Sequence, residues 1–262
     1  IAKETAEASL KAFEEGLGVI LFERHTRKVV LTKVGEYLKI EFSLQLKTLS
    51  HTFENAKMLH HGKKGVLKIG YVGSAMQDVI PDLLLRFEKN NPNILFNLQE
   101  IDNQHQLDDL LSFSLDIGFV RLERVPRTLE IKTILKENFC LVLPKNHLIN
   151  EDNFISLAQF KEESFILFDA KYSTSYHEKV MQIFDDCGFS PLSSHNTIHS
   201  SSIFKLVENN FGISIVPKSL AQKRGHNIKF IELVSISQKT TLSVIWNKKK
   251  TNPILNDVLR LL

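Results

Sequence analysis

The stretch VLKIGYV at residues 66–72 decides the fold, because it begins a rhythm that continues to the end of the chain. It has the length and the apolar content of a buried strand. A segment with helical spacing follows at 79–87, and further strand-like runs lie at 94–98 and 116–120. Strands that alternate with helices predict an α/β fold with a mostly parallel sheet covered on both faces.

The same alternation returns further along the chain. We expect strands at 139–143, 165–168, 213–216 and 242–246, and helices at 106–111, 176–187, 203–209 and from Pro253 to Leu262. The chain from Val66 onward therefore predicts two α/β units of about 100 residues each, within the usual size of a domain.

A long helix is expected immediately before this region. No Gly or Pro occurs between Glu36 and His61, and apolar residues recur at spacings of 4, 4, 3, 4 and 3. They are Leu38, Phe42, Leu46, Leu49, Phe53 and Ala56. A helix of about 25 residues extends roughly 38 Å and presents one apolar stripe. The stripe predicts a partner helix, the alternative being a helix that lies on its own domain. Residues 60–65 are expected to form a hinge.

The first residues predict a helix and a small basic hairpin. From Thr5 to Leu17 the apolar residues fall on one helical face, and Gly18 is expected to end the helix. A basic turn at 24–28 and a short strand at 29–31 follow.

The excess positive charge lies at the front of the chain. Residues 1–64 hold 11 Lys and Arg against 8 Asp and Glu, whereas residues 65–262 hold 22 of each. The basic turn at 24–28 is the densest cluster, and such a patch favours a polyanion by releasing counterions. A solvated surface loop is the alternative.

Composition places the chain among ordinary globular proteins. Hydrophobic residues make up 43% and charged residues 24%. Two cysteines, Cys140 and Cys187, provide no disulfide framework. Neither a long apolar run nor the pattern of a signal peptide is found, so we expect a cytoplasmic protein.

No motif in the sequence indicates catalysis. Metalloprotease, nucleophile-elbow, P-loop and dinucleotide-binding motifs do not occur. His195 and His199 are four residues apart, but no third metal ligand is evident. The adjacent acids at 108–109 and 185–186 point apart on helices. We therefore predict no enzyme, no catalytic residue, no metal and no cofactor.

Several polar residues occur where strands end and helices begin. Ser74, Asn103 and the run Ser200, Ser201 and Ser202 follow or precede such elements. Backbone N–H groups at helix N-termini favour anions, and the crevice of an open parallel sheet lies at the carboxyl ends of its strands. These residues predict a site for a small carboxylate if they converge; otherwise each is an ordinary helix cap.

The sequence resembles the LysR-type transcriptional regulators. The segments AFEEGLGVILFER at 12–24 and VLTKVG at 30–35 look like the recognition helix, turn and wing of their winged helix-turn-helix. The segments 67–72, 115–119 and 212–217 resemble motifs of their effector domain. The resemblance implies a partial winged helix-turn-helix at 1–35, a dimerising linker helix at 36–62 and a two-lobed type II periplasmic-binding-protein-like effector domain at 66–262. Lobe I would comprise 66–138 and 243–262, and lobe II 139–242.

The resemblance also implies partners and site residues. The partners would be double-stranded operator DNA, a small organic-acid effector and further copies of the chain in a homodimer or homotetramer. DNA would meet Lys3, Thr5, Ser9, Arg24, His25, Thr26, Arg27 and Lys28. The stretches 68–74, 116–122 and 143–147 are most similar to the muconate- and benzoate-responsive branch, in which Ser74 and Asn103 would hold effector carboxylates. Asn103 stands where those relatives have Thr.

The front of the chain departs from the family. Glu4 and Glu7 lie on the expected recognition helix, where they would face phosphates with the wrong sign. The first helices of the motif are missing, and roughly 30 further residues are expected upstream. The alternatives are a diverged regulator that has lost DNA binding, a solute-binding protein and an enzyme built on the same two lobes.

Overall fold

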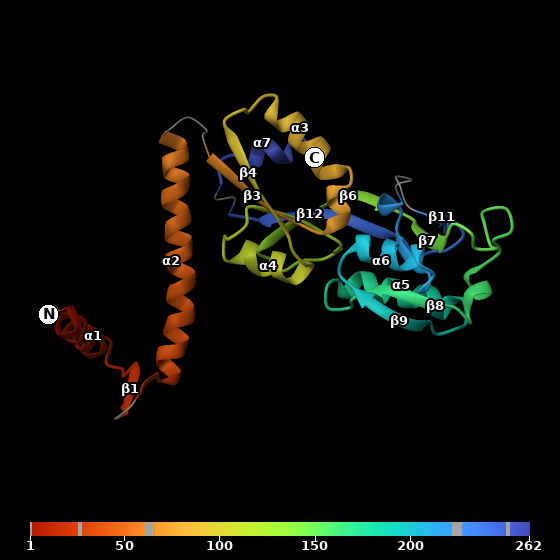
Figure 1. Cartoon of the computed structure of the whole chain (residues 1–262). Coiled ribbons are helices and arrows are strands. Elements are labelled where there is room, and N and C mark those ends of the chain that lie inside the picture. Colours follow the sequence, from red (N-terminus) through yellow and green to blue (C-terminus); the bar gives the residue numbers. More distant parts are fainter. Residues whose placement is uncertain (1, 26–27, 61–64, 222–226, 250–251) are drawn as a thin grey trace. The chain divides into compact units, whose positions relative to one another are not determined.

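The chain divides into two compact units, Ile1–Glu54 and Asn55–Leu262. The computed structural model describes residues 2–25, 28–60, 65–221, 227–249 and 252–262 (Figure 1). α2 crosses the boundary between the two units.

The first unit contains two helices and a hairpin: α1 (Ala2–Leu17), β1 (Phe22–His25), β2 (Lys28–Leu31) and α2 (Lys33–His60). Gly18, at φ +69°, follows the end of α1 as expected. A carboxylate oxygen of Glu14 accepts a hydrogen bond from the backbone N–H of Leu21 at 2.6 Å. This bond holds the segment between α1 and β1 against α1. The Thr32 hydroxyl accepts the Gly35 N–H at 3.0 Å and thereby caps the start of α2.

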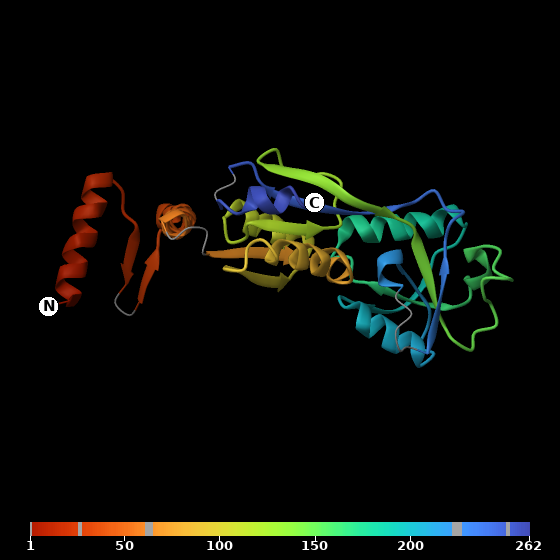
Figure 2. The ribbon, with the colours of Figure 1, turned by 90° about the horizontal axis from the view of Figure 1, so that it is seen from above.

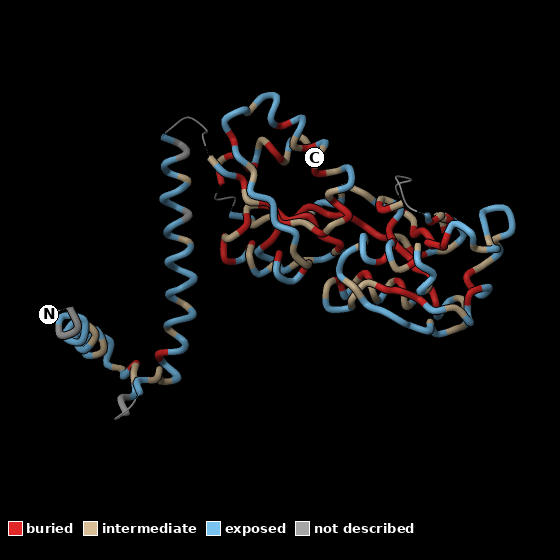
Figure 3. The backbone as a smooth tube through the Cα atoms, viewed as in Figure 1, coloured by how far each residue is buried: buried red, intermediate tan, exposed pale blue. Residues whose placement is uncertain are grey.

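The apolar stripe expected on the long helix is largely exposed (Figure 3). Leu46 is 65% exposed, Leu49 49% and Phe53 59%. Near its start the stripe meets α1, where the rings of Phe42 and Phe13 lie 6.2 Å apart. Beyond that contact, nothing in the described part of the first unit buries the stripe.

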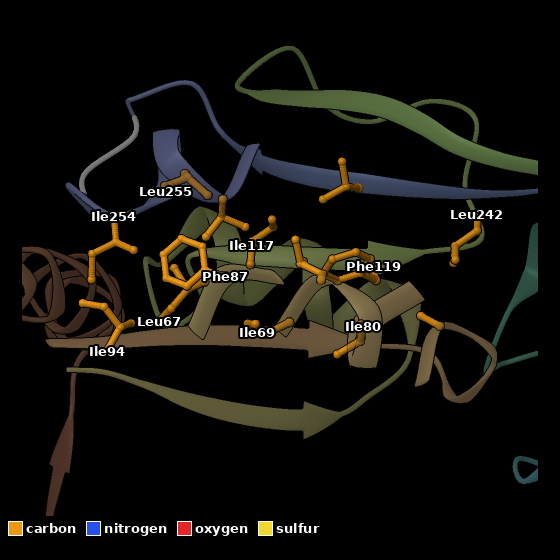
Figure 4. Packing of buried hydrophobic residues seen from close by; sticks show 14 of the residues in the cluster. Leu67, Ile69, Ile80, Phe87, Ile94, Ile117, Phe119, Leu242, Ile254 and Leu255 are labelled. Carbon is orange, nitrogen blue, oxygen red and sulfur yellow. The ribbon is translucent and has the colours of Figure 1, made fainter. Parts of the chain in front are cut away.

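Lobe I of the second unit is built on a five-stranded sheet in the order β4-β3-β5-β12-β6. Its strands are β3 (Gly65–Tyr71), β4 (Ile94–Glu100), β5 (Ile117–Val120), β6 (Leu129–Glu137) and β12 (Thr240–Asn247). The helical elements are η1 (Gly73–Met76), α3 (Val79–Glu88), α4 (Asn103–Leu111) and α7 (Leu255–Leu259). Apolar residues from the sheet and from α3 and α7 form its core, among them Leu67, Ile69, Phe87, Ile117 and Phe119 (Figure 4).

Lobe II contains two small sheets, ordered β10-β7-β11 and β8-β9. Their strands are β7 (Phe139–Pro144), β8 (Ser164–Phe168), β9 (Leu192–Thr197), β10 (Ser214–Pro217) and β11 (Ile228–Glu232). The helical elements are η2 (Leu157–Phe160), α5 (Thr174–Asp186), α6 (Ser200–Glu208) and η3 (Lys218–Leu220). All six residues of β7 are buried, as its unbroken apolar run requires. The chain passes between the lobes from β6 to β7 and from β11 to β12 (Figure 2).

The expectation of a mostly parallel sheet is wrong in part. β3 pairs in parallel with β4 and β5, but β12 is antiparallel to both β5 and β6, and β7 is antiparallel to both of its neighbours. β6, β9 and β11 were not predicted from the sequence. β6 mixes polar and apolar residues without a regular alternation, and most of β9 is exposed, so neither forms the apolar run that marks a buried strand.

Candidate functional site

A pocket lies between the two lobes, at the carboxyl ends of β3, β4 and β5. This interlobe pocket has a cavity volume of about 40 Å³ and is partly open to solvent. Lobe II contributes the segments that follow β8, β9 and β10. The described lining residues are Val72, Gly73, Ser74, Glu100, Arg121, Phe168, Tyr172, Ser173, Tyr176, Ile198, Ser200, Pro217 and Leu220.

A buried arginine forms the base of the interlobe pocket. Arg121 follows β5 and is 5% exposed, and its Nη2 lies 2.6 Å from an oxygen of Glu137 at the end of β6. Nη2 also donates to Ser219 of lobe II, and Nη1 donates to Thr240. Burial lowers the pKa of Arg121, although the adjacent Glu137 favours the charged form. The guanidinium therefore contacts both lobes, and Glu137 already neutralises its positive charge.

Ser74 lies in the pocket, but not as the cap of a long helix. It belongs to the short 3-10 helix η1, and its hydroxyl oxygen accepts from Nε of Arg121 at 3.0 Å. Because the oxygen accepts from the scaffold, the hydroxyl hydrogen remains available to donate to a ligand. The expected position as a helix opener is thus wrong in detail.

Asn103 lies beside the pocket without lining it. Its Nδ2 donates to the Ser173 hydroxyl at 2.8 Å, and its Oδ1 accepts the backbone N–H of Arg121 at 3.0 Å. The residue that caps α4 is Asp102, which accepts the His105 N–H at 2.9 Å. The amide of Asn103 is therefore engaged in tying lobe I to lobe II.

Ser173 also lines the pocket, although the sequence did not predict it. It is 6% exposed and stands at the N-cap position of α5, where its oxygen accepts from Asn103. Its hydroxyl hydrogen is thereby left to donate, as in Ser74. The run ST before a helix was a signal that could have found it.

The three serines at 200–202 do not act together. α6 begins at Ser200, with His199 at the N-cap position, so the run lies in the first turn rather than before the helix. Ser200 lines the pocket, whereas Ser201 and Ser202 are exposed and do not. Side chains at consecutive helix positions point in different directions, which explains the separation.

One acidic and two aromatic groups complete the pocket. Glu100 is the last residue of β4, and its Oε1 lies 3.5 Å from Nδ1 of His199 in lobe II. Burial raises the pKa of Tyr172 to about 12, and Glu100 adds to the rise. The Tyr176 hydroxyl donates to the carbonyl of Ile215 at 3.0 Å.

The expected DNA-contacting residues lie in the first unit. Thr5 and Ser9 are exposed and one turn apart on α1, and Lys28 is exposed at the start of β2. Thr26 and Arg27 lie outside the described residues, as do the side chains of Lys3, Arg24 and His25. Glu7 is exposed on α1, close to Thr5 in sequence.

The described residues contain no group of three or more His, Cys, Asp or Glu side chains that could hold a metal ion. His195 is exposed on β9 beside Phe211, apart from the contact that His199 makes with Glu100. Over the same described ranges, no helix is both long and apolar enough to span a membrane.

Comparison with known proteins gives consistent matches along the chain. Residues 60–262 match the family described as the LysR substrate binding domain. The chain is 29% identical over 258 residues to the HTH-type transcriptional regulator TtuA of Agrobacterium vitis, covering 97% of this chain and 85% of that protein. Full-length CbnR complexed with its target DNA superposes with a TM-score of 0.72 at 24% identity, covering 97% of this chain and 87% of CbnR. The BenM effector binding domain with its effector benzoate superposes with a TM-score of 0.65 at 22% identity. The match covers 75% of this chain and 90% of the BenM domain.

Proposed function

The chain belongs to the LysR family of transcriptional regulators, and from this premise we propose that it is a cytoplasmic, dimeric or tetrameric regulator whose promoter binding responds to a small carboxylate. The proposed division is a partial winged helix-turn-helix at 1–35, a linker helix at 36–62 and an effector domain at 66–262. The solute-binding and enzymatic alternatives have no comparable support, because the matched relatives are named as transcriptional regulators.

The observation that carries the effector proposal is the set of hydroxyl donors in the interlobe pocket. The oxygens of Ser74 and Ser173 accept from Arg121 and Asn103, so both hydroxyl hydrogens are left to donate to a ligand. Ser200 adds a third hydroxyl from the first turn of α6, where the helix dipole favours an anion. BenM, which shares the fold, binds benzoate.

A ligand in this pocket would act on the arrangement of the lobes. Ser74 belongs to lobe I, whereas Ser173 and Ser200 belong to lobe II, so one carboxylate that accepts from both sides favours one interlobe geometry. A ligand shifts an equilibrium only by its differential affinity for the two states. In a dimer, the change would alter the spacing of paired DNA-binding heads.

A matched pair of serine variants tests the effector site. Ser200→Ala should weaken the binding of a small carboxylate about 10-fold, the usual effect of losing a hydrogen bond to a charged group. Ser201→Ala is the control, because Ser201 lies next to it on the exposed side of α6. Thermal shift with a panel of small carboxylates gives the readout. Equal binding by both variants would contradict the assignment.

The DNA proposal depends on the basic hairpin. Lys28→Ala should weaken duplex binding for all sequences and reduce the slope of log K against log salt by about 1. Lys89→Ala, an exposed lysine at the end of α3, is the control. An unchanged salt slope in the Lys28 variant would remove Lys28 from the DNA interface.

A further inference from the structure

The charges that line the interlobe pocket are not balanced. Among the described lining residues, Arg121 and Glu100 are the two with a formal charge at neutral pH. The charge of Arg121 is matched by Glu137 at 2.6 Å. The ion pair of Glu100 among the described residues is with His199, at 3.5 Å, which is longer than a charge-assisted hydrogen bond of about 2.7–2.9 Å. The pocket therefore presents a carboxylate with a weak partner beside hydroxyl donors.

We propose that the effector is an amino acid with an apolar side chain, whose carboxylate accepts from Ser74 and Ser173 and whose ammonium group donates to Glu100. This assignment rests on the proposed function, since it names the chemical class of the effector for the same pocket.

The placement of Glu100 suits a ligand with adjacent charges of opposite sign. A Cβ atom on Gly73 would lie 2.7 Å from Oε1 of Glu100, so the carboxylate sits directly against the backbone at Gly73. The next residue is Ser74, which carries the donor hydroxyl. An α-amino acid has its ammonium and carboxylate on the same carbon, and it can therefore reach both neighbouring positions at once.

A ligand with a carboxylate alone fits less well. Its negative charge would approach Glu100, and two carboxylates that share a site disfavour each other. The ammonium group of an amino acid replaces that repulsion with an attraction. Selectivity then comes from the penalty on the wrong ligand as well as from contacts with the right one.

The remaining walls predict the side chain of the ligand. The remaining pocket walls are mainly apolar and are formed by Val72, Phe168, Tyr176, Pro217 and Leu220. Leucine and phenylalanine are therefore suitable probes.

The test compares amino acids with their deaminated counterparts on the full chain. Calorimetry with L-phenylalanine, 3-phenylpropanoate, 3-phenyllactate and phenethylamine separates the contributions of the two charged groups, and leucine with 4-methylpentanoate repeats the comparison for an aliphatic side chain. We expect the amino acids to bind at least about 10-fold more tightly than the acids without an ammonium group.

Charge-neutral variants locate the discrimination. Glu100→Gln should weaken amino-acid binding about 10-fold and strengthen binding of 3-phenylpropanoate, so the preference disappears. Glu88→Gln, which removes the same charge from the exposed end of α3, should bind like the unmodified chain.

The outcomes separate this inference from the proposed function. If 3-phenylpropanoate binds as tightly as L-phenylalanine, or if Glu100→Gln keeps the preference, the amino-acid assignment is overturned while the carboxylate effector stands. Equal binding of 3-phenyllactate overturns the ammonium assignment. If phenethylamine binds and the carboxylates do not, the assignment of a ligand carboxylate to Ser74 and Ser173 is overturned. If none of the probes in either series binds, both the inference and the carboxylate effector are rejected.

Discussion

The two units of this chain differ in how they bury their apolar residues. The second unit encloses four clusters of buried side chains between its sheets and helices. The first unit buries Leu21 beneath the hairpin but leaves Leu46, Leu49 and Phe53 exposed along α2. The sequence pattern is strongly periodic in both regions. Periodicity therefore predicts that an apolar face will be covered, but whether the same unit covers it depends on how many elements that unit contains.

The largest expected effect concerns the second unit, which buries its own apolar residues. Glu137→Gln leaves Arg121 buried without a full counter-charge, which should lower the free energy of unfolding by about 3–5 kcal/mol. Arg121 and Glu137 are 5% and 9% exposed, so solvent offers little screening. Urea unfolding of the variant and of the unmodified chain measures the difference.

An exposed glutamate provides the control for this variant. Glu130 is half-exposed, and its contact with Lys248 is 3.8 Å long, so Glu130→Gln should change the free energy of unfolding by less than about 1 kcal/mol. Similar effects in the two variants would mean that the buried pair contributes no more to the free energy of unfolding than the exposed one.

The Arg121 network also shows the limit of prediction from sequence. The strands around Ser74 and Arg121 were predicted because apolar runs mark them, and Ser74 was identified from its position after a strand. Glu137 and Ser219, however, meet Arg121 across 16 and 98 residues of sequence. No local pattern encodes such a meeting. Asn103 was predicted near the pocket, but its amide was already engaged by Ser173, a partner 70 residues away.

The second prediction tests whether another chain covers the stripe on α2. Leu46→Glu places a charge in the middle of the stripe and removes a large apolar contact, which should weaken dimerisation by about 2 kcal/mol per chain. Light scattering coupled to size exclusion at micromolar concentration measures the loss. Gln45→Glu adds the same charge at the neighbouring exposed position, outside the stripe, and should leave the assembly unchanged. An unmodified chain that is already monomeric would contradict the proposed dimer.

The smallest effect compares one helix cap from each unit. Thr32 caps α2 through an uncharged hydroxyl, and Asp102 caps α4 through a carboxylate. Replacing either residue with Ala should destabilise the first turn of its helix by about 1 kcal/mol at neutral pH. Amide hydrogen exchange in those turns, corrected for the intrinsic rate, measures both effects.

The two caps should differ in their dependence on pH. Partial burial raises the pKa of Asp102, but hydrogen bonds from His105 outweigh it, and the pKa lies below its ordinary value of 3.8. A lowered pKa means that the stabilisation is fully present above 3.8 and is lost as pH falls through the lower, folded-state value. The effect of Asp102→Ala should therefore shrink in strong acid, whereas that of Thr32→Ala should stay constant because the hydroxyl does not titrate.

His105 sets the upper end of the pH range in which the Asp102 cap is strongest. Its hydrogen bond with Asp102 raises the pKa of His105 above 6.5, so its contribution is present below 6.5 and is lost as pH rises through the folded-state value. The Asp102 cap should thus be strongest between about pH 4 and 6.5, and His105→Gln should remove the decline on the alkaline side while leaving the decline in acid. A cap on α4 that is equally strong at pH 5 and pH 9 would show that the backbone hydrogen bond from His105 acts alone.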